Sequence, residues 1–474
     1  MALVVLRLDV SMALYAWKRY SSGMNKQQRL VLVVSILASL VAFLDGSVVN
    51  VALPAIAKSL NGGLVVQQWV VDAYLLTLGS LILIAGSLSD IIGRKRILQV
   101  GLIGFGAASV LCAVAPTSGF LIGARALQGA AGALLVPSSL AIIIATFSGA
   151  AQGKAIGSWT AWTGISFIIG PLIGGAMVDA GSWRGVFWIN VLPIAITLWL
   201  LGKLQLPEQD RAGKHVDFMG AWLCSLGLLG TVFALIEQPH YGWGSPLIWV
   251  TGLLGIVMLV AFVWYEGRVK EPMLPLELFK IRNFSFGNLA TTFIYAALSI
   301  ATFVLVVFEQ EVGQYTALEA GLSLIPVTAI MFFLSPRVGA LAGKYGPRWF
   351  MTIGPVVAAA GFLTMLRVTP AVNYWTQILP GILLFGVGLS ITVAPLTAAV
   401  LGSIKPEQAG IASAVNNAIA RIAGLVATAA IGLIVGGGNI ELVGFWQGVI
   451  VMAALLIAGG LVSWVGIRGQ LEPK

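Results

Sequence analysis

The stretch Gly86-Ser-Leu-Ser-Asp90-Ile-Ile-Gly93-Arg94-Lys95-Arg96 separates two apolar runs, near residues 68–88 and 96–115. Each run is long enough to cross a bilayer, which takes roughly 20 mostly apolar residues in a helix. The charged stretch between them is therefore predicted to be a turn at one membrane surface. Because lipid offers the backbone no hydrogen-bond partners and the runs show no alternation, both are predicted to be helices rather than barrel strands.

The same pattern extends along the whole chain. Of its residues, 58% are hydrophobic and only 9% are charged, and the mean hydropathy is +0.96. The sequence predicts an all-α polytopic membrane protein with fourteen spans. The spans are expected near residues 30–53, 68–88, 96–115, 120–145, 155–178, 185–204, 217–237, 246–265, 284–308, 318–336, 346–366, 375–400, 408–435 and 443–466.

The basic residues predict the orientation of these spans, since Lys and Arg accumulate on the cytoplasmic side. With both termini in the cytoplasm, 22 of the 27 Lys and Arg residues lie inside and 3 outside, namely Lys58, Arg184 and Arg367. The remaining two, Arg125 and Arg421, fall within spans. The net charge of +9 is therefore explained by topology and contact with anionic lipid, and binding of nucleic acid is not expected.

A second turn suggests that the chain is duplicated. Gly339-Ala-Leu-Ala-Gly343-Lys-Tyr-Gly346-Pro-Arg348 echoes the turn at Gly86, again at a predicted cytoplasmic junction. The offset of 253 residues, 339 minus 86, is too long for six spans, so two extra spans are expected between the halves. The predicted parts are a cytoplasmic segment 1–29, a six-helix bundle 30–204, a linker with two additional spans 205–283, a six-helix bundle 284–466 and a cytoplasmic tail 467–474.

The first 23 residues leave two interpretations open. Arg7 and Asp9 interrupt the apolar start before a signal-peptide core forms, so a cleaved signal is not expected. Either Met24 is the natural start, or residues 1–23 form a short interfacial helix that carries Tyr15, Trp17 and neighbouring basic residues.

The sequence contains few residues with enzymatic or metal-binding chemistry. Cys112 and Cys224 fall within spans, so no disulfide is expected, and His215 and His240 have no partner at ligand spacing, so no metal is expected. No ATP-binding motif or nucleophile–base set is present in a suitable context. We expect no enzyme activity and no cofactor, and nothing indicates ATP-driven pumping, so energy for transport must come from another source.

Several motifs occur in a fixed order along the chain. They are Leu44-Asp45-Gly-Ser47-Val-Val-Asn50-Val-Ala-Leu-Pro54, the Gly86–Arg96 turn, Arg125-Ala-Leu-Gln128-Gly129, Gly164-Ile-Ser-Phe-Ile-Ile-Gly170-Pro171-Leu-Ile-Gly174-Gly175, Trp183-Arg184, Phe187-Trp-Ile-Asn190-Val-Leu-Pro193, the linker from Glu271 to Phe284, and the segment from Ala409 to Arg421. In this order they resemble the major facilitator superfamily and, within it, the fourteen-helix drug/proton antiporters. The resemblance implies paired bundles with a substrate site between them near the midplane.

Asp45 lies about halfway along the first span, where an ionised carboxylate must find a partner or take a proton. We expect it to couple transport to protons, because a lipophilic cation would favour its charged form and displace a proton. The alternative is a structural role, in which Asp45 bonds neighbouring helices through Ser47 or Asn50.

Arg125 and Arg421 are cations inside spans, where they need a partner or a cavity. Arg125 is expected to contact Asp45, Gln128 or backbone carbonyls, and the resemblance implies a part in proton transfer. A purely structural tie remains the alternative. For Arg421 we predict proton coupling, with a structural role and binding of anionic substrates left open.

Glycine-rich segments are predicted to gate the transporter. Gly86 and Gly93 allow close approach at a turn where Asp90 and Arg94 could form a breakable latch, although this stretch could also be only a positive-inside loop. In the fifth span, Gly164, Gly170 and Gly174 around Pro171 predict a bent, closely packed helix that serves both packing and alternating access.

The predicted substrate cavity combines aromatic and polar side chains. Its members are Phe43, Asn50, Tyr74, Gln128, Trp159, Trp162, Phe293 and Glu309. The aromatic rings suit planar lipophilic cations, although packing against lipid or protein is the competing role. Asp72, Asp179, Glu237 and Glu311 stand near predicted outer span ends and are expected to be mostly solvated, whereas Glu309 could serve a dication or a second proton.

The sequence thus predicts a monomeric, proton-coupled antiporter in a bacterial-type inner membrane that exports drug-like, amphipathic or lipophilic cationic small molecules. An exporter of one endogenous metabolite, lipid or siderophore is the first alternative. A non-transporting membrane sensor is the second, and the short linkers and tail offer no signalling domain for it. Export rather than uptake depends on the resemblance of the Gly164–Gly175 segment to the antiporter motif.

Overall fold

A computed structural model describes residues 24–205, 216–405, 408–437 and 440–469, with the side chains of Asp90 and Ala150 left aside. Within these ranges the regular structure is entirely helical, and fourteen helical segments are long and apolar enough to cross a membrane. The prediction of an all-α protein with fourteen spans is confirmed. Residues 1–23 of the expected N-terminal segment, residues 206–215 of the expected linker and residues 470–474 of the expected tail lie outside the described residues.

The first half of the chain contributes six spans. Its helices are α2 (Lys26–Ser59), α3 (Leu64–Ile92), α4 (Arg94–Ala113), α5 (Ser118–Thr146), α6 (Gly149–Gly164), α7 (Ser166–Asp179), α8 (Gly185–Trp188) and α9 (Val191–Gly202). The fifth span, expected as one helix, is divided into α6 and α7 at Ile165, and the sixth span consists of α8 and α9. We call residues 24–205 the N-half.

Two helices and a linker follow, and then the second six spans. The two additional helices are α10 (Phe218–Tyr241) and α11 (Pro246–Glu266), and the linker contains η1 (Leu276–Lys280). The remaining helices are α12 (Arg282–Glu311), α13 (Ala317–Ser323), α14 (Ile325–Tyr345), α15 (Arg348–Thr364), η2 (Met365–Arg367), η3 (Tyr374–Ile378), α16 (Leu379–Leu401), α17 (Ala409–Ala429), α18 (Ile431–Val435) and α19 (Leu442–Gly466). We call residues 282–469 the C-half.

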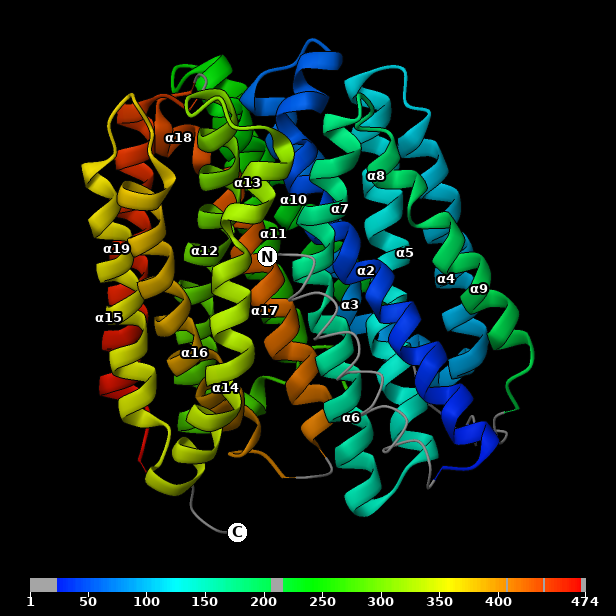
Figure 1. The fold of residues 1–474 in the computed structure, drawn as a ribbon. Coiled ribbons are helices and arrows are strands. Elements are labelled where there is room, and N and C mark those ends of the chain that lie inside the picture. Colours follow the sequence, from blue (N-terminus) through cyan, green and yellow to red (C-terminus); the bar gives the residue numbers. More distant parts are fainter. Residues whose placement is uncertain (1–23, 206–215, 406–407, 438–439, 470–474) are drawn as a thin grey trace.

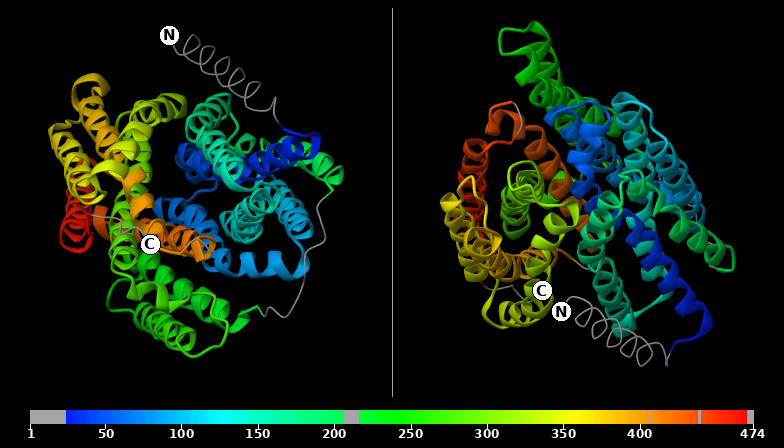
Figure 2. Two further views of the ribbon diagram at one scale, coloured as in Figure 1. Left: turned by 90° about the horizontal axis from the view of Figure 1, so that it is seen from below. Right: turned by 45° about the horizontal axis from the view of Figure 1, so that its top comes forward.

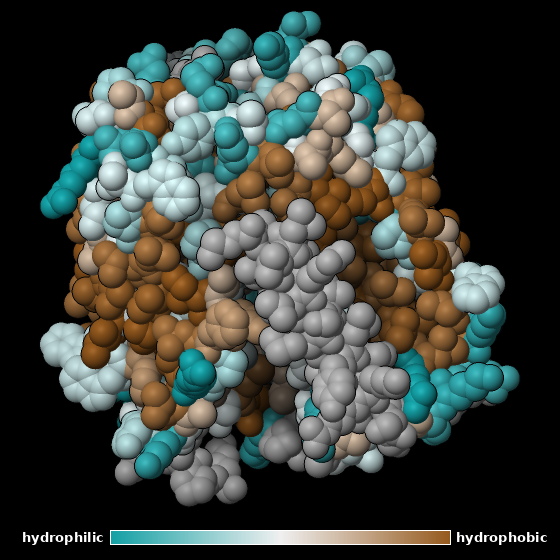
Figure 3. Space-filling view, in the orientation of Figure 1, coloured by the Kyte–Doolittle hydropathy of each residue, from teal (hydrophilic) through white to brown (hydrophobic). Residues whose placement is uncertain are grey.

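The two halves stand side by side, and both run their spans in the same general direction (Figure 1). An apolar band crosses the middle of the visible face, with polar residues above and below it, as expected for a protein whose solvent is a bilayer (Figure 3). The α3–α4 turn lies at the lower edge of Figure 1, where α2 begins. We call this the basic end, since it carries the basic turns predicted to be cytoplasmic, and the other the far end.

The glycines of the α3–α4 turn were expected to allow close approach to another part of the chain, and the structure does not show this. Gly93 adopts φ 106°, a conformation that side chains rarely take, so the glycine is required by the turn itself. A Cβ at Gly93 or at Gly86 would meet nothing within 4 Å, so neither glycine allows a close approach in this conformation. Lys95 donates from Nζ to the Leu204 carbonyl at 2.6 Å, which ties the turn to the end of the sixth span.

The halves meet tightly at the far end, between α7 and α13. A Cβ added at Gly175 would lie 2.4 Å from the Cα of Leu318, and one added at Gly321 would lie 2.6 Å from the Pro171 carbonyl oxygen. Small residues therefore bring the two backbones into direct contact. Gly170 and Gly174 have another partner, because a Cβ at either would clash with Ser47 or Val48 of α2 within the same half.

Polar contacts reinforce this junction. The carboxylate of Asp179 accepts from the backbone N–H groups of Ala317 and Leu318, at 3.0 and 3.1 Å, and so caps the first turn of α13 in the other half. Gln310 donates to the Val51 carbonyl at 3.1 Å, and Gln67 donates to Glu311 at 3.0 Å. Asp179 is exposed, as the sequence predicted, and also caps α13, whereas Glu311 is half-buried and paired with Gln67.

Figure 1 shows α7 beside α13 in its upper part. The backbone contact between these two helices therefore closes the boundary between the halves at the far end.

The α10–α11 pair lies along the opposite edge and touches both halves (Figure 2, left). Trp69 of α3 donates its indole N–H to Glu237 of α10 at 2.8 Å, so Glu237 is also paired rather than solvated. On the other side, a Cβ at Gly432 of α18 would lie 3.1 Å from Pro239 of α10. The two additional helices thus bridge the halves, while α11 is largely exposed to lipid.

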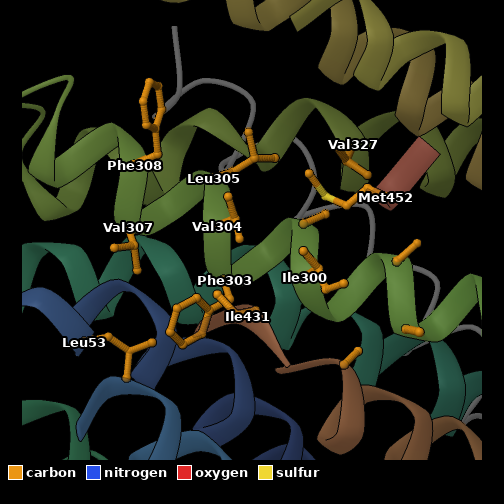
Figure 4. Packing of buried hydrophobic residues seen from close by; sticks show 14 of the residues in the cluster. Leu53, Ile300, Phe303, Val304, Leu305, Val307, Phe308, Val327, Ile431 and Met452 are labelled. Carbon is orange, nitrogen blue, oxygen red and sulfur yellow. The ribbon is translucent and has the colours of Figure 1, made fainter. Parts of the chain in front are cut away.

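The largest apolar cluster is centred on α12 and crosses the boundary between the halves. Figure 4 shows Leu53 of α2 in the same cluster as Phe303 and Phe308 of α12. Phe308 stacks on Phe445 of α19 with ring centroids 4.0 Å apart. The far ends of α2 and α12 are therefore held by apolar packing as well as by the polar contacts.

Replacing Gly175 by Ala is expected to favour opening of the far end, because the new Cβ would overlap the backbone of Leu318. The measurement is the distance between spin labels placed at the far ends of α7 and α13, which should lengthen. Gly123→Ala is the matched control, since a Cβ there meets nothing within 4 Å. An unchanged distance distribution in Gly175→Ala would contradict the assignment of this contact as the far-end closure.

Candidate functional site

A buried ion pair occupies the middle of the N-half. Asp45 of α2 and Arg125 of α5 are 0% and 1% exposed, and a carboxylate oxygen of Asp45 lies 2.5 Å from Nη1 of Arg125. Among the residues that the structure describes, the Asp45–Arg125 pair joins two oppositely charged side chains that are both buried. The expected contacts of Arg125 are all present, because it also donates to Gln128 at 2.6 Å and to the Val70 carbonyl at 2.9 Å.

The other oxygen of Asp45 is held by two amides. Gln128 donates to Asp45 Oδ1 at 2.8 Å, and Asn190, which precedes α9, donates to the same oxygen at 2.9 Å. Both amides also donate to the Ser109 hydroxyl of α4, at 2.8 and 3.3 Å. We call Asp45, Ser109, Arg125, Gln128 and Asn190 the buried network.

Aromatic rings enclose the guanidinium of Arg125. Tyr74 of α3 is 2% exposed, and its ring centroid lies 4.3 Å from the Arg125 carbon CZ. The ring of Phe187 lies 5.8 Å away on α8. The guanidinium is therefore enclosed by π-faces in a buried position, where such faces stabilise a cation.

The polar neighbours of Asp45 in the first span do not bond it. The Ser47 hydroxyl donates to the carbonyls of Leu44 and Ser166, and Asn50 donates to the Gly46 carbonyl at 3.4 Å. A structural role for Asp45 through these two residues is thus not what the structure shows. Asp45 instead connects α2 to α5 and to the start of α9.

Three residues expected in the substrate cavity are buried. Gln128 and Tyr74 belong to the interior of the N-half, and Glu309 is 0% exposed at the far end, where one oxygen accepts from Ser323 at 2.7 Å. None of the three lines an open space in this conformation. The reason is that spacing along one helix does not distinguish the face toward the other half from the face toward its own bundle.

The remaining aromatic residues divide between packing and the interface. Trp159 donates to Ser39 at 3.0 Å and, like Trp162, packs against the core of the N-half. Phe293 faces α19, because a Cβ at Gly459 would lie 3.4 Å from its Cβ. Phe43, in contrast, points toward the C-half, where the guanidinium of Arg421 lies 5.6 Å from its ring centroid.

The face of α2 that carries Phe43, Gly46 and Asn50 borders an open space between the halves. Gly46 is exposed although it lies mid-span, and a Cβ there would meet nothing within 4 Å. Phe167 of α7, 6.1 Å from Phe43, is 52% exposed. We call the surroundings of Phe43, Gly46, Asn50, Phe167 and Arg421 the central face. Asp45 lies on the same helix but points into the N-half.

Two residues of the buried network were missed in the sequence. Asn190 stands in a motif, but its contact with Asp45 depends on the division between α8 and α9, which the sequence did not predict. Ser109 is a small polar residue in an apolar span, and such residues most often bond their own helix. The gating candidate Gly164 ends α6 beside open space, and the side chain of Asp90 lies outside the described residues.

Two paired helical bundles around a central face, with a buried ion pair in one bundle, define a polytopic membrane transporter. The family model described as Major Facilitator Superfamily matches residues 35–428. The chain belongs to the major facilitator superfamily.

Similar proteins include resistance proteins of actinobacteria. The chain is 35% identical to the puromycin resistance protein of Streptomyces alboniger, over 84% of this chain and 80% of that protein. It is 32% identical to the methylenomycin A resistance protein of Streptomyces coelicolor, over 89% of each. A crystal structure of a D-xylose-proton symporter shares the fold, with a TM-score of 0.67 at 15% identity, and covers 94% of this chain and 99% of that one. The chain is a multi-pass membrane transporter and not an enzyme.

Asp45→Asn and Arg125→Gln are each expected to lower the thermal stability of the protein strongly. Either change leaves a buried charge without its partner, which costs roughly 3–5 kcal/mol in soluble proteins. The double variant Asp45→Asn/Arg125→Gln is expected to recover much of the loss, because no net charge then remains. Thermal unfolding in detergent measures the effect, with exposed Arg367→Gln as control. Additive losses in the double variant would show that the two residues are not an energetic pair.

Proposed function

We propose that this protein is a proton-coupled antiporter that exports drug-like, amphipathic small molecules by alternating access. The observation that carries the proposal is the fully buried Asp45–Arg125 pair, one helix away from the central face. The named activities of the relatives, resistance to puromycin and to methylenomycin A, support export of such compounds.

The pair couples protons to conformation through charge balance. A proton on Asp45 would leave Arg125 as an uncompensated cation in a dry interior, which is strongly unfavourable. Protonation therefore requires a change that hydrates or re-pairs Arg125, and such a change must move α2 relative to α5. Because α2 also forms the central face, its movement alters the site where substrate binds.

The contacts that close the far end support alternating access, because they have to break before the central face can open to that side. In this conformation a substrate enters from the basic end and meets the central face. Protonation of Asp45 from the far side, after the α7–α13 junction opens, then returns the transporter to its starting state. Arg125 tunes the proton site, while the small-residue junction prevents a leak when closed.

We place the protein in a bacterial-type inner membrane with both termini in the cytoplasm, because of the distribution of Lys and Arg. It acts as a monomer, with lipids as its surroundings and small molecules and protons as its ligands. The proton gradient supplies the energy, so no cofactor takes part.

The test is proton-driven uptake of puromycin and methylenomycin A into everted proteoliposomes. Wild-type protein is expected to concentrate at least one of them when the interior is acidic and to lose this activity when the gradient is collapsed. Asp45→Asn is expected to lose concentrative transport, because the proton site is gone. Glu441→Gln, which removes an exposed carboxylate, is the matched control and should transport normally. Full gradient-driven activity of a folded Asp45→Asn variant would exclude Asp45 as the coupling residue.

A further inference from the structure

Arg421 of α17 is a mid-span cation that lies between the two halves. Its guanidinium is 5.6 Å from the Phe43 ring of α2, and its Cβ would lie 3.6 Å from a Cβ at Gly79 of α3. Arg421 is half-buried, and its guanidinium lies beside the central face at Phe43.

Within the part of the chain that the structure describes, Arg421 has no hydrogen-bond or carboxylate partner. Its guanidinium contacts the ring of Phe43. This distinguishes it from Arg125, whose charge is neutralised by Asp45 at 2.5 Å. An unpaired arginine within a span is costly unless it faces water or a ligand, and its planar donors match a carboxylate in two-point geometry.

The acidic side chains of the spans are directed elsewhere. Asp45, Asp72 and Glu309 are each 0% exposed. Asp45 is engaged with Arg125, and Glu309 lies behind the far-end contacts with Ser323. Asp72 is on α3 one turn beyond Gln68, which donates to the Thr428 and Ala429 carbonyls near the far end of α17. Thus none of these three buried carboxylates forms an ion pair with Arg421.

The apolar surroundings of Arg421 suit a flat, lipophilic body. Phe43 is half-buried, Phe167 is 52% exposed and 6.1 Å from Phe43, and Gly46 leaves room between them. A ligand could place a ring against these two phenyl groups while its charged end reaches α17. The charge at that end must be negative, because a cation would be repelled by the guanidinium.

We infer that Arg421 is the recognition residue for substrates that carry an acidic group, so that the central face selects lipophilic carboxylates over cations. The inference rests on the proposed export function and replaces the expected preference for cations. It also predicts charge movement. Export of a monovalent anion with entry of one proton moves two charges in the same electrical sense, whereas a monovalent cation exchanged for one proton moves none.

The first experiment measures binding of three matched compounds in detergent without any gradient. They are 1-naphthylacetate, 1-naphthylacetamide and 2-(1-naphthyl)ethylamine, which share a ring system and differ in charge. Calorimetry on wild-type protein is expected to show the acid binding roughly tenfold or more tighter than the amide, and the amine weakest. Equal affinities, tighter binding of the amine, or no binding of any of the three would overturn the inference.

Variants then locate the selectivity. Arg421→Gln is expected to bring the acid down to the affinity of the amide, and Arg421→Lys to keep part of the preference, since it retains charge but loses the two-point geometry. Arg367→Gln, which removes an exposed arginine at the far end, should change nothing. An acid preference that persists in Arg421→Gln contradicts the assignment.

Charge movement gives an independent measurement that needs no variant. Solid-supported membrane currents in wild-type proteoliposomes should be large on adding 1-naphthylacetate and small on adding the amine. Currents of the same size with both would oppose the inference. If the acid binds selectively but no compound is transported, the proposed export function fails and Arg421 recognition stands. If compounds are transported without a preference for the acid, the proposed export function stands and the recognition role of Arg421 fails.

Discussion

The ion pair of Asp45 and Arg125 constrains the whole N-half, because neither charge can be lost alone in a dry interior. Helices α2, α3, α4 and α5 and the residue before α9 all contribute a bond or a ring to it. This sharing ties these elements of the N-half together around one buried polar centre. Since α2 carries this centre on one face and the central face on another, a single helix separates the proposed proton site from the proposed substrate site.

The boundary between the halves is held differently from the interior of the N-half. At the far end, Gly175 and Gly321 let backbones touch, and a few single hydrogen bonds join α7 to α13 and α2 to α12. No charge pair of the described residues has to separate when this junction opens. Opening of this junction therefore does not itself require the Asp45–Arg125 pair to break.

The fold could be predicted from the sequence because span length and Lys and Arg placement follow from the lipid environment itself. Asp45 with Arg125 and Gln128 was accessible as well, since a charge inside a span must be paired. The breaks in the fifth and sixth spans could not be predicted, because they depend on contacts between distant helices. For the same reason the contact of Asn190 with Asp45 could not be predicted. Spacing along a helix also could not show which face a residue lies on. Tyr74 was therefore expected in the cavity, although its ring lies against Arg125. Glu237 was expected in a solvated rim, although it accepts a hydrogen bond from Trp69.

The α10–α11 pair sets the geometry of any movement between the halves. Since α10 contacts α3 of one half and α18 of the other, the two halves are joined along this edge. Movement about this edge would leave the α10 contacts in place, so the α10–α11 pair would limit how far one half can slide past the other.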